Sequence, residues 1–227
     1  MTNKKTQVKK MFDSIAYRYD LLNHLLSVGI DIYWRKRSLR LTELPVNAIL
    51  LDVACGTGDF AITARKMGIK NIFGADLSHE MLKLFNSKTG WSKGNTMQIV
   101  AEFPPVKNES VTNITVGFGV RNFYDIQQAF DAFYRILKPG GKATILEFRL
   151  PSNRLVRSVY QFYFRRILPV IGGLISRDKD AYVYLPESVR EFDEKVNMPQ
   201  LFRNSGFSEV KSHALTFGIV QVVIATK

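Results

Sequence analysis

The stretch LLDVACGTGDFAITARKMGIKNIFGADLS, residues 50–78, decides the fold. Its opening apolar run predicts a buried parallel strand over 48–54. Gly56 and Gly58 interrupt that run, and the residues after them predict a helix over 59–67. A glycine turn between a strand and a helix lets a ligand approach the backbone at the positive end of the helix. The stretch therefore predicts a ligand site as well as a fold.

The same alternation of strand and helix continues along the chain. Further strands are predicted over 71–75, 111–116 and 142–148, and further helices over 78–85 and 126–137. Near the C-terminus, two β-rich runs over 209–215 and 219–226 are separated by Thr216-Phe217-Gly218, which predicts a hairpin. The pattern therefore predicts an α/β fold with an open, mostly parallel sheet, helices on both faces and a terminal hairpin.

Two carboxylates flank the glycine turn. Asp76 follows the second strand twenty residues after Gly56, the spacing at which an acid accepts hydrogen bonds from ribose hydroxyls. Asp52, at the end of the first strand, would repel a pyrophosphate but favour a ligand that carries an ammonium group. S-adenosylmethionine has both features, although the turn alone also matches a G-x-G-x-x-A signature for NAD. A purely structural role for both acids, as a turn acceptor and a helix cap, remains open.

The residues from Leu51 to Gly58 resemble motif I of class I S-adenosylmethionine-dependent methyltransferases. The resemblance implies a Rossmann-like, doubly wound sheet of seven strands whose last strand is reversed, so the terminal hairpin fits it. Ala54 stands where this motif usually has its first glycine, and we expect that small change to be tolerated.

Four further segments resemble the C-methyltransferases of ubiquinone and menaquinone biosynthesis, and together they span nearly the whole chain. These segments are Tyr19–Asn23 with Ser27 and Trp34, Phe118–Asn122, Arg135–Gly141 running to Glu147, and Tyr182–Ser188. The resemblance implies methyl transfer from S-adenosylmethionine to a ring carbon of a polyprenylated quinol, typically demethylmenaquinol giving menaquinol. A phenolate must then be stabilised beside the methyl group.

The same resemblance implies the site residues. We expect Arg121 to stabilise the phenolate or to orient a water that takes its proton, with Asn122 and Tyr19 positioning the ring. A salt bridge that holds a lid is the alternative for Arg121. The expected cofactor contacts are Asp52, Gly56, Thr57, Gly58, Asp76, Leu77, Val100, Ala101 and Gly117.

The chain departs from the family pattern at several positions. Val100 stands where members carry an acidic or amide side chain, so the adenine amino group is left to the backbone of Val100 and Ala101 or to Glu102. Asp31 replaces a family histidine, and Val111-Thr112 replaces a Phe-Asp pair. These departures bear on cofactor affinity and substrate choice, not on Asp52 or Arg121.

Other function classes fit less well. The Gly117–Val120 segment lacks the Asn/Asp-Pro-Pro-aromatic motif of methyltransferases that act on amino groups of DNA or protein. The single cysteine, Cys55, lies in the glycine turn, which excludes disulfides within the chain, a cysteine zinc site and a cysteine nucleophile for RNA. We therefore expect no nucleic-acid partner and no metal. An O-methyltransferase of a small phenol and a non-catalytic scaffold subunit remain as alternatives.

Length and charge set the remaining expectations. At 227 residues the chain predicts one domain, divided into an N-terminal helical lid (1–45), a cofactor-binding core (46–150), a helical insert at the substrate (151–190), and a C-terminal helix and hairpin (191–227). Its net charge of +12 favours anionic partners.

The insert concentrates this positive charge. Arginines and a lysine are interleaved there with aromatic and aliphatic residues, namely Arg154, Arg157, Arg165, Arg166, Arg177 and Lys179 with Tyr160, Phe162, Tyr163, Phe164 and Ile167. We expect a cytoplasmic protein whose insert contacts the anionic inner face of the cytoplasmic membrane. A lid core with solvated charges is the alternative, and one sequence leaves the oligomeric state unknown.

Overall fold

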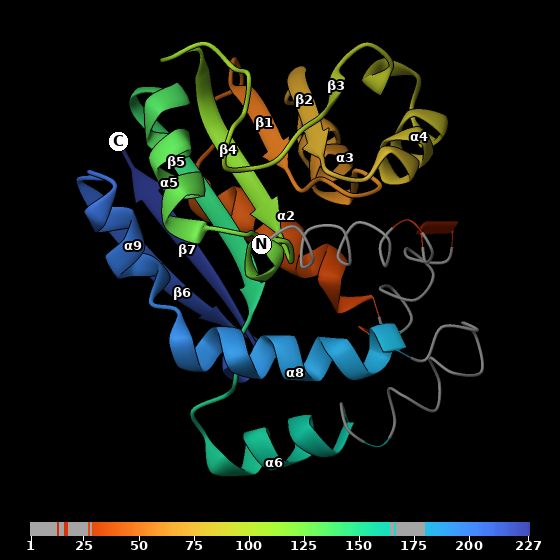
Figure 1. Ribbon diagram of the computed structural model, residues 1–227, viewed down its shortest axis with the longest axis vertical. Coiled ribbons are helices and arrows are strands. Elements are labelled where there is room, and N and C mark those ends of the chain that lie inside the picture. Colours follow the sequence, from red (N-terminus) through yellow and green to blue (C-terminus); the bar gives the residue numbers. More distant parts are fainter. Residues whose placement is uncertain (1–12, 14–15, 18–26, 28, 164–165, 167–179) are drawn as a thin grey trace.

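The computed structural model describes residues 13, 16–17, 27, 29–163, 166 and 180–227. Its centre is a seven-stranded sheet in the order β3-β2-β1-β4-β5-β7-β6 (Figure 1). The strands are β1 (Ile49–Val53), β2 (Asn71–Asp76), β3 (Thr96–Gln98), β4 (Val111–Gly117), β5 (Leu137–Phe148), β6 (Glu209–Leu215) and β7 (Val220–Thr226). This order confirms the predicted doubly wound sheet.

Strand direction confirms the predicted hairpin. β1 pairs in parallel with β2 and β4, and the parallel pairing extends to β3 and β5. β7 runs antiparallel to both β5 and β6. The short turn Thr216–Gly218 (η4) joins β6 to β7, as the sequence predicted. The last strand is therefore the reversed strand of the class I methyltransferase fold.

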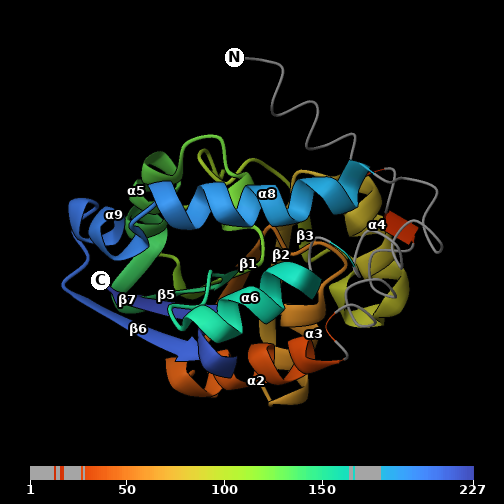
Figure 2. The same ribbon diagram turned by 90° about the horizontal axis from the view of Figure 1, so that it is seen from below.

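Helices cover both faces of the sheet, which forms the middle of three layers (Figure 2). The helices are α2 (Ile30–Thr42), α3 (Asp59–Lys66), α4 (His79–Lys88), α5 (Ile126–Ile136), α6 (Arg154–Phe162), α8 (Asp180–Lys195) and α9 (Met198–Asn204), with the short 3₁₀ turns η1 (Gly90–Ser92) and η2 (Val120–Asn122). One apolar core joins α2, α3 and α4 to the sheet, and a second core joins α5, α8 and α9 to its other face.

Local sequence explains where several helices begin. The Ser78 side chain accepts a hydrogen bond from the Met81 N–H at the start of α4, and the Asp125 side chain accepts one from the Gln128 N–H at the start of α5. Along α5, buried alanine and phenylalanine side chains recur at helical spacing and face the second core. Capping and periodicity therefore fix these helices as predicted.

Two boundaries differ from the prediction. Helix α5 ends at Ile136, and the chain from Leu137 already pairs with β4, with a register shift before the regular ladder resumes at Lys142. Helix α8 runs through residue 190, so the boundary placed there between the insert and the C-terminal segment falls inside a helix. The division into a lid, core and insert otherwise stays a prediction.

The carboxyl ends of β1, β2, β4 and β5 lie at the same edge of the sheet because these strands are parallel. Ligands of open α/β sheets bind outside this edge. Helices α6 and α8 lie beyond it, at the bottom of Figure 1. In the described part of the chain, no helix is long and apolar enough to cross a bilayer.

Candidate functional site

The glycine turn between β1 and α3 has left-handed backbone at alternate residues. Ala54, Gly56 and Gly58 have φ values of 51°, 54° and 88°. Left-handed backbone costs a residue with a side chain roughly 1–2 kcal/mol, so Ala54 is strained where the motif usually has glycine. A Cβ on Gly119 would lie 2.7 Å from the Ala54 Cβ, so the glycine at 119 leaves room for this methyl group. The alanine is thus accommodated, at the cost of strain.

Asp76 is fixed at the mouth of this turn. Its Oδ2 accepts a hydrogen bond of 2.8 Å from the Gly56 N–H, and its Oδ1 accepts one of 2.8 Å from the Ser78 N–H. Burial raises the pKa of the carboxyl, and these N–H donors oppose that rise. A carboxylate offers about four lone-pair positions, and the Leu77 N–H also interacts with this carboxyl, so at least one position remains for a ligand hydroxyl. The structure therefore brings Asp76 and Gly56 together, as their spacing predicted.

Asp52 has a structural role that the sequence left open. Its side chain is fully buried, with Oδ1 accepting from the Thr115 hydroxyl at 2.8 Å and Oδ2 from the Ala61 N–H at 3.2 Å. Burial raises the pKa of Asp52 to about 7, although the two hydrogen bonds and nearby Arg35 lower it. Asp52 thus joins β1 to β4 and to α3 while it also borders the cavity at the turn. Its ammonium-binding role stays a prediction.

That cavity opens to solvent and lies between the turn and the helices on one face of the sheet. It is lined by the glycine turn, by Gly117 at the end of β4, by Asp59 and Phe60 from α3, and by Arg35 from α2. The predicted residues Gly56, Thr57 and Gly117 therefore share one wall. Carboxylates, a guanidinium and helix N-terminal N–H groups suit a ligand with hydroxyls and a zwitterionic end, so this donor set fits S-adenosylmethionine.

Gly58 lies in the turn for a different reason. A Cβ at Gly58 would lie 2.1 Å from Cδ2 of the buried Phe85 side chain of α4. Its left-handed backbone and this close contact both require glycine. The structure therefore explains Gly58 by packing, and a direct cofactor contact at this position stays a prediction.

The segment after β3 lies beside the end of β2, which carries Asp76 and Leu77. Leu77 accepts a hydrogen bond from the Gln98 side chain at 2.9 Å, which ties β3 to the end of β2. The Val100 carbonyl accepts from the Phe103 N–H, and Ala101 is buried. Glu102 is also buried, but its carboxylate accepts from the backbone N–H groups that precede α5. Glu102 therefore anchors α5, and the backbone of residues 100 and 101 remains for the adenine.

Arg121 forms a buried ion pair, but its partner is the strand residue Glu147 and not a residue of a lid. Its Nη1 lies 2.7 Å from Oε1 of Glu147, at the end of β5, and donates to the Phe118 carbonyl at 2.6 Å. The two side chains of the ion pair are 7% and 0% exposed. Asn122 follows in the same turn η2, where its N–H donates to the Gly119 carbonyl. Tyr19 lies outside the described residues.

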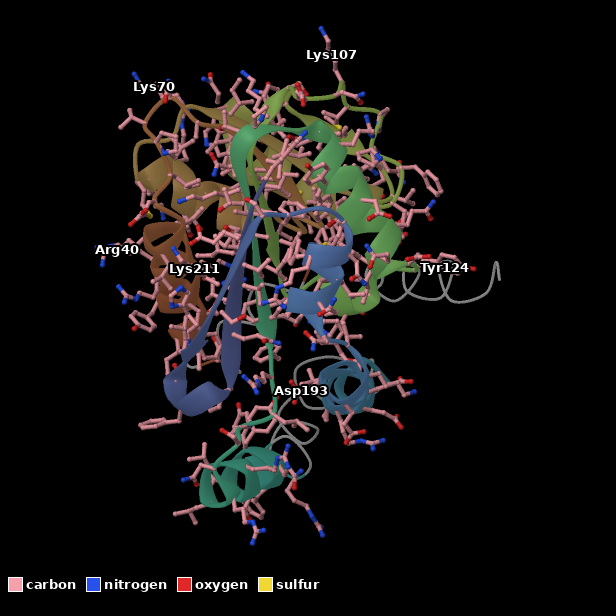
Figure 3. The ribbon with its side chains drawn as sticks, turned by 90° about the vertical axis from the view of Figure 1, so that its left-hand side faces the viewer. Arg40, Lys70, Lys107, Tyr124, Asp193 and Lys211 are labelled. Carbon is pink, nitrogen blue, oxygen red and sulfur yellow. The ribbon has the colours of Figure 1, made fainter. Side chains whose placement is uncertain are left out.

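Helices α6 and α8, beyond the sheet edge, pack near the Arg121–Glu147 pair. Helix α8 contacts η2, and the Asp193 side chain of α8, labelled in Figure 3, accepts a hydrogen bond from the Leu150 N–H at 3.2 Å. Tyr160 of α6 is buried close to Arg121 and Glu147, and this burial raises the pKa of its phenol. Tyr160 is therefore buried near the Arg121–Glu147 pair and does not belong to the predicted exposed aromatic surface.

The whole chain, residues 1–227, matches the model of the ubiE/COQ5 methyltransferase family. The chain belongs to this family. Among its relatives, the "Ubiquinone/menaquinone biosynthesis C-methyltransferase UbiE" of Geotalea daltonii is 41% identical and the alignment covers 100% of this chain and 99% of the relative. The "Demethylmenaquinone methyltransferase" of Chlorobaculum tepidum is 38% identical, over 100% of this chain and 94% of the relative.

Solved structures agree on the fold of this ubiE/COQ5 family member. An S-adenosylmethionine-dependent methyltransferase from Thermotoga maritima superposes with a TM-score of 0.67 at 19% identity, over 96% of this chain and 99% of that protein. The [4+2]-cyclase SpnF superposes with a TM-score of 0.63 at 14% identity, over 98% and 95%. Such distant likeness shows the class I methyltransferase fold and leaves the reaction to the site.

Membership in the ubiE/COQ5 family confirms the predicted enzyme class. The chain is a methyltransferase, and S-adenosylmethionine is its methyl donor. Among the described residues no cluster of three histidine, cysteine or acidic side chains could hold a metal ion. Sequence reasoning missed Arg35, whose position next to the signature residue Trp34 was the available signal, and it missed the pairing of Arg121 with Glu147.

Proposed function

We propose that the chain transfers a methyl group from S-adenosylmethionine to a ring carbon of a polyprenylated quinol, converting demethylmenaquinol to menaquinol. Full-length relatives at 38–41% identity that carry the names of this activity support the proposal. The observation that carries it is the buried Arg121–Glu147 pair at the carboxyl edge of the sheet, next to the strand end that borders the cofactor cavity.

The chemistry needs a stabilised phenolate. When bound, S-adenosylmethionine supplies an electrophilic methyl group, which a quinol ring carbon accepts once the neighbouring hydroxyl has lost its proton. The Arg121 guanidinium provides a fixed positive charge that stabilises the phenolate oxygen or orients the water that takes the proton. Glu147 and the Phe118 carbonyl hold that guanidinium in place, so little reorganisation is needed during the reaction.

The remaining site residues have binding roles in this proposal. Asn122, next to Arg121, and Tyr19 position the quinol ring. Asp76 accepts a hydrogen bond from the ribose with a lone-pair position that its backbone N–H donors leave open. Asp52, Gly56, Thr57, Gly58 and Gly117 surround the sulfur and amino-acid end, while Leu77, Val100 and Ala101 contact the adenine.

The product identifies the reaction. Purified enzyme is incubated with S-adenosylmethionine and a chemically reduced demethylmenaquinone, and the product is analysed by mass spectrometry and NMR. We expect a new ring C-methyl group with wild type and at least a hundredfold lower kcat with Arg121→Met, because the phenolate loses its fixed charge. A methyl ether as the product would favour the O-methyltransferase alternative and contradict this proposal.

We also propose that the insert brings the enzyme to the membrane where its prenylated substrate resides. Helix α6 presents Leu155, Val159 and Phe162, at helical spacing, with exposures of 75%, 63% and 61%. Arg154 and Arg157 lie exposed on the same helix. Apolar side chains flanked by arginines suit the anionic interface of a bilayer. Of the other residues named for this surface, Arg166 is exposed, whereas Phe164, Arg165, Ile167, Arg177 and Lys179 lie outside the described residues.

The hairpin tip extends this membrane surface. Phe217 is 82% exposed, and an ideal Cβ on its neighbour Gly218 would lie 3.8 Å from the Cα of Pro151, just before α6. Both features lie at the edge of the sheet that holds the candidate site. A membrane bound here would therefore be next to the substrate entrance.

Vesicle co-sedimentation tests this contact. We expect binding to vesicles that contain phosphatidylglycerol, weaker binding at high salt, and loss of binding in the double variant Arg154→Glu, Arg157→Glu. Arg190→Glu, on the exposed face of α8, is the matched control and should bind like wild type. Equal sedimentation of the double variant and wild type would contradict the proposed surface.

A further inference from the structure

Arg35 is a cation buried in the wall of the cofactor cavity. It lies in the middle of α2 and is 6% exposed. Its neighbour Trp34 donates a hydrogen bond from Nε1 to the Thr216 hydroxyl at 2.7 Å, which fixes α2 against the hairpin tip. The Arg35 guanidinium lies 5.6 Å from the centre of the Phe118 ring. The fold therefore fixes both the helix that carries Arg35 and the position of its guanidinium.

Two carboxylates hold the guanidinium, but not equally. Nη1 donates a short hydrogen bond to Asp31, one turn earlier in α2 and itself 3% exposed. Nη2 lies 3.7 Å from Asp59, an ion-pair separation longer than a hydrogen bond. Asp59 is also paired with Lys88 at 3.3 Å. Within the described residues, Nη2 thus has a charge partner and forms no hydrogen bond.

The Arg35 guanidinium is therefore a cationic hydrogen-bond donor at the cavity, and burying such a charge costs free energy unless it is paired. Among the described residues that line it, Arg35 is the one cation, and Asp52 and Asp59 are the carboxylates. A buried guanidinium with N–H groups left to donate suits a planar carboxylate, with which it forms two parallel hydrogen bonds. A ligand that also carries an ammonium would match the carboxylates of the same wall.

We propose that Arg35 binds the carboxylate at the amino-acid end of S-adenosylmethionine and that Asp31 positions its guanidinium. This inference rests on the proposed cofactor site and adds a residue to it. Asp76 lies on the β2 side of the glycine turn, whereas Arg35, Gly117 and Thr57 border the cavity on the β1 and β4 side. An adenosyl group held at Asp76 would thus leave its amino-acid end facing Arg35.

Two ligands that differ only in the amino-acid end separate this role from a structural one. S-adenosylhomocysteine has the carboxylate and the ammonium, and 5′-methylthioadenosine has neither. Calorimetric titration of the full chain is run with both ligands on wild type and on Arg35→Gln. We expect the Kd of Arg35→Gln for S-adenosylhomocysteine to rise about 10- to 100-fold, as for a lost charge-assisted hydrogen bond. Its Kd for 5′-methylthioadenosine should stay within about twofold of wild type, because that ligand does not reach Arg35.

Further variants keep the test decisive. Arg37→Ala, an exposed arginine of the same helix, is the matched control and should bind both ligands like wild type. If Arg35→Gln does not fold, Arg35→Lys retains the charge without the planar fork and should show a smaller, still selective loss. Decarboxylated S-adenosylhomocysteine, which keeps the ammonium, should bind wild type and the variant equally well.

Two results would overturn the proposal. One is wild-type affinity of Arg35→Gln for S-adenosylhomocysteine, and the other is an equal loss for both ligands, which would make Arg35 a purely structural residue. Either leaves the cofactor site itself intact. Failure of wild type to bind either ligand would instead contradict the cofactor site, and the role of Arg35 with it.

Discussion

Replacing Glu147 by methionine removes the carboxylate that forms an ion pair with the buried Arg121 guanidinium. The pair is joined at 2.7 Å, and its side chains are 0% and 7% exposed, so water cannot replace the lost carboxylate. Removing one partner of such a buried pair costs about 3–5 kcal/mol. In a protein of this length that loss lowers Tm by about 6–20 °C. We therefore expect Glu147→Met to be strongly destabilised and inactive.

The double variant separates stability from catalysis. Replacing both partners by methionine also removes the buried positive charge, so the free energy of unfolding should return to within roughly 1 kcal/mol of wild type. Activity should not return, because the phenolate still lacks the Arg121 charge. Glu194→Gln is the control for a surface pair, since Arg190 and Glu194 are about half exposed and their loss should cost at most about 1 kcal/mol.

Urea unfolding and quinol methylation are measured on the same preparations. An unchanged unfolding midpoint for Glu147→Met would contradict this prediction, because removing the carboxylate of a buried ion pair would then cost nothing. A double variant that methylates the quinol at the wild-type rate would refute the catalytic role of Arg121.

Three further predictions concern stability near the turn. Ala54→Gly should raise the free energy of unfolding by up to about 1 kcal/mol, because relief of about 1–2 kcal/mol of left-handed strain exceeds the extra entropy of the unfolded chain. Gly119→Ala should be destabilising in wild type and better tolerated in Ala54→Gly, since its Cβ would lie 2.7 Å from that of Ala54; equal costs in both backgrounds would contradict the contact. Because burial raises the pKa of Asp52 from 3.8 to about 7, the folded state binds more protons than the unfolded state between these pH values. The contribution of Asp52 to the free energy of unfolding is therefore complete below pH 4 and is lost as the pH rises through 7. Asp52→Asn should gain up to about 4 kcal/mol relative to wild type between pH 4 and pH 8 in urea unfolding, and parallel pH profiles would contradict this assignment.

Most of the fold follows from local signals in the sequence. The strands β1, β2 and β4 are short, largely buried runs rich in apolar and β-branched residues, and the helices α4 and α5 carry side-chain caps. β3 was missed because Thr96–Gln98 spans three residues, none fully buried, and has no apolar run. Its pairing with β2 depends on tertiary context that periodicity does not record.

The sequence predicts those site contacts that depend on residue spacing within one βαβ unit. Gly56 and Asp76 meet because consecutive parallel strands end at one edge of the sheet. Arg35 and Glu147 depend on how α2 and β5 pack against segments tens of residues away, and sequence spacing does not predict such contacts. Asp31 differs from these residues, because its pairing with Arg35 spans one helical turn, and only its burial depends on how α2 packs against the sheet.

The proposed function depends on a cofactor site formed by the glycine turn and Asp76, and one titration tests that site directly. Purified enzyme is titrated with S-adenosylmethionine by calorimetry beside the Asp76→Ala variant and an Asp131→Ala control, which changes an exposed residue of α5. We expect micromolar binding by wild type and the control, and at least tenfold weaker binding by Asp76→Ala, roughly 1.4 kcal/mol for lost ribose hydrogen bonds. Absence of binding by wild type, or equal affinity of Asp76→Ala, would contradict the proposed site.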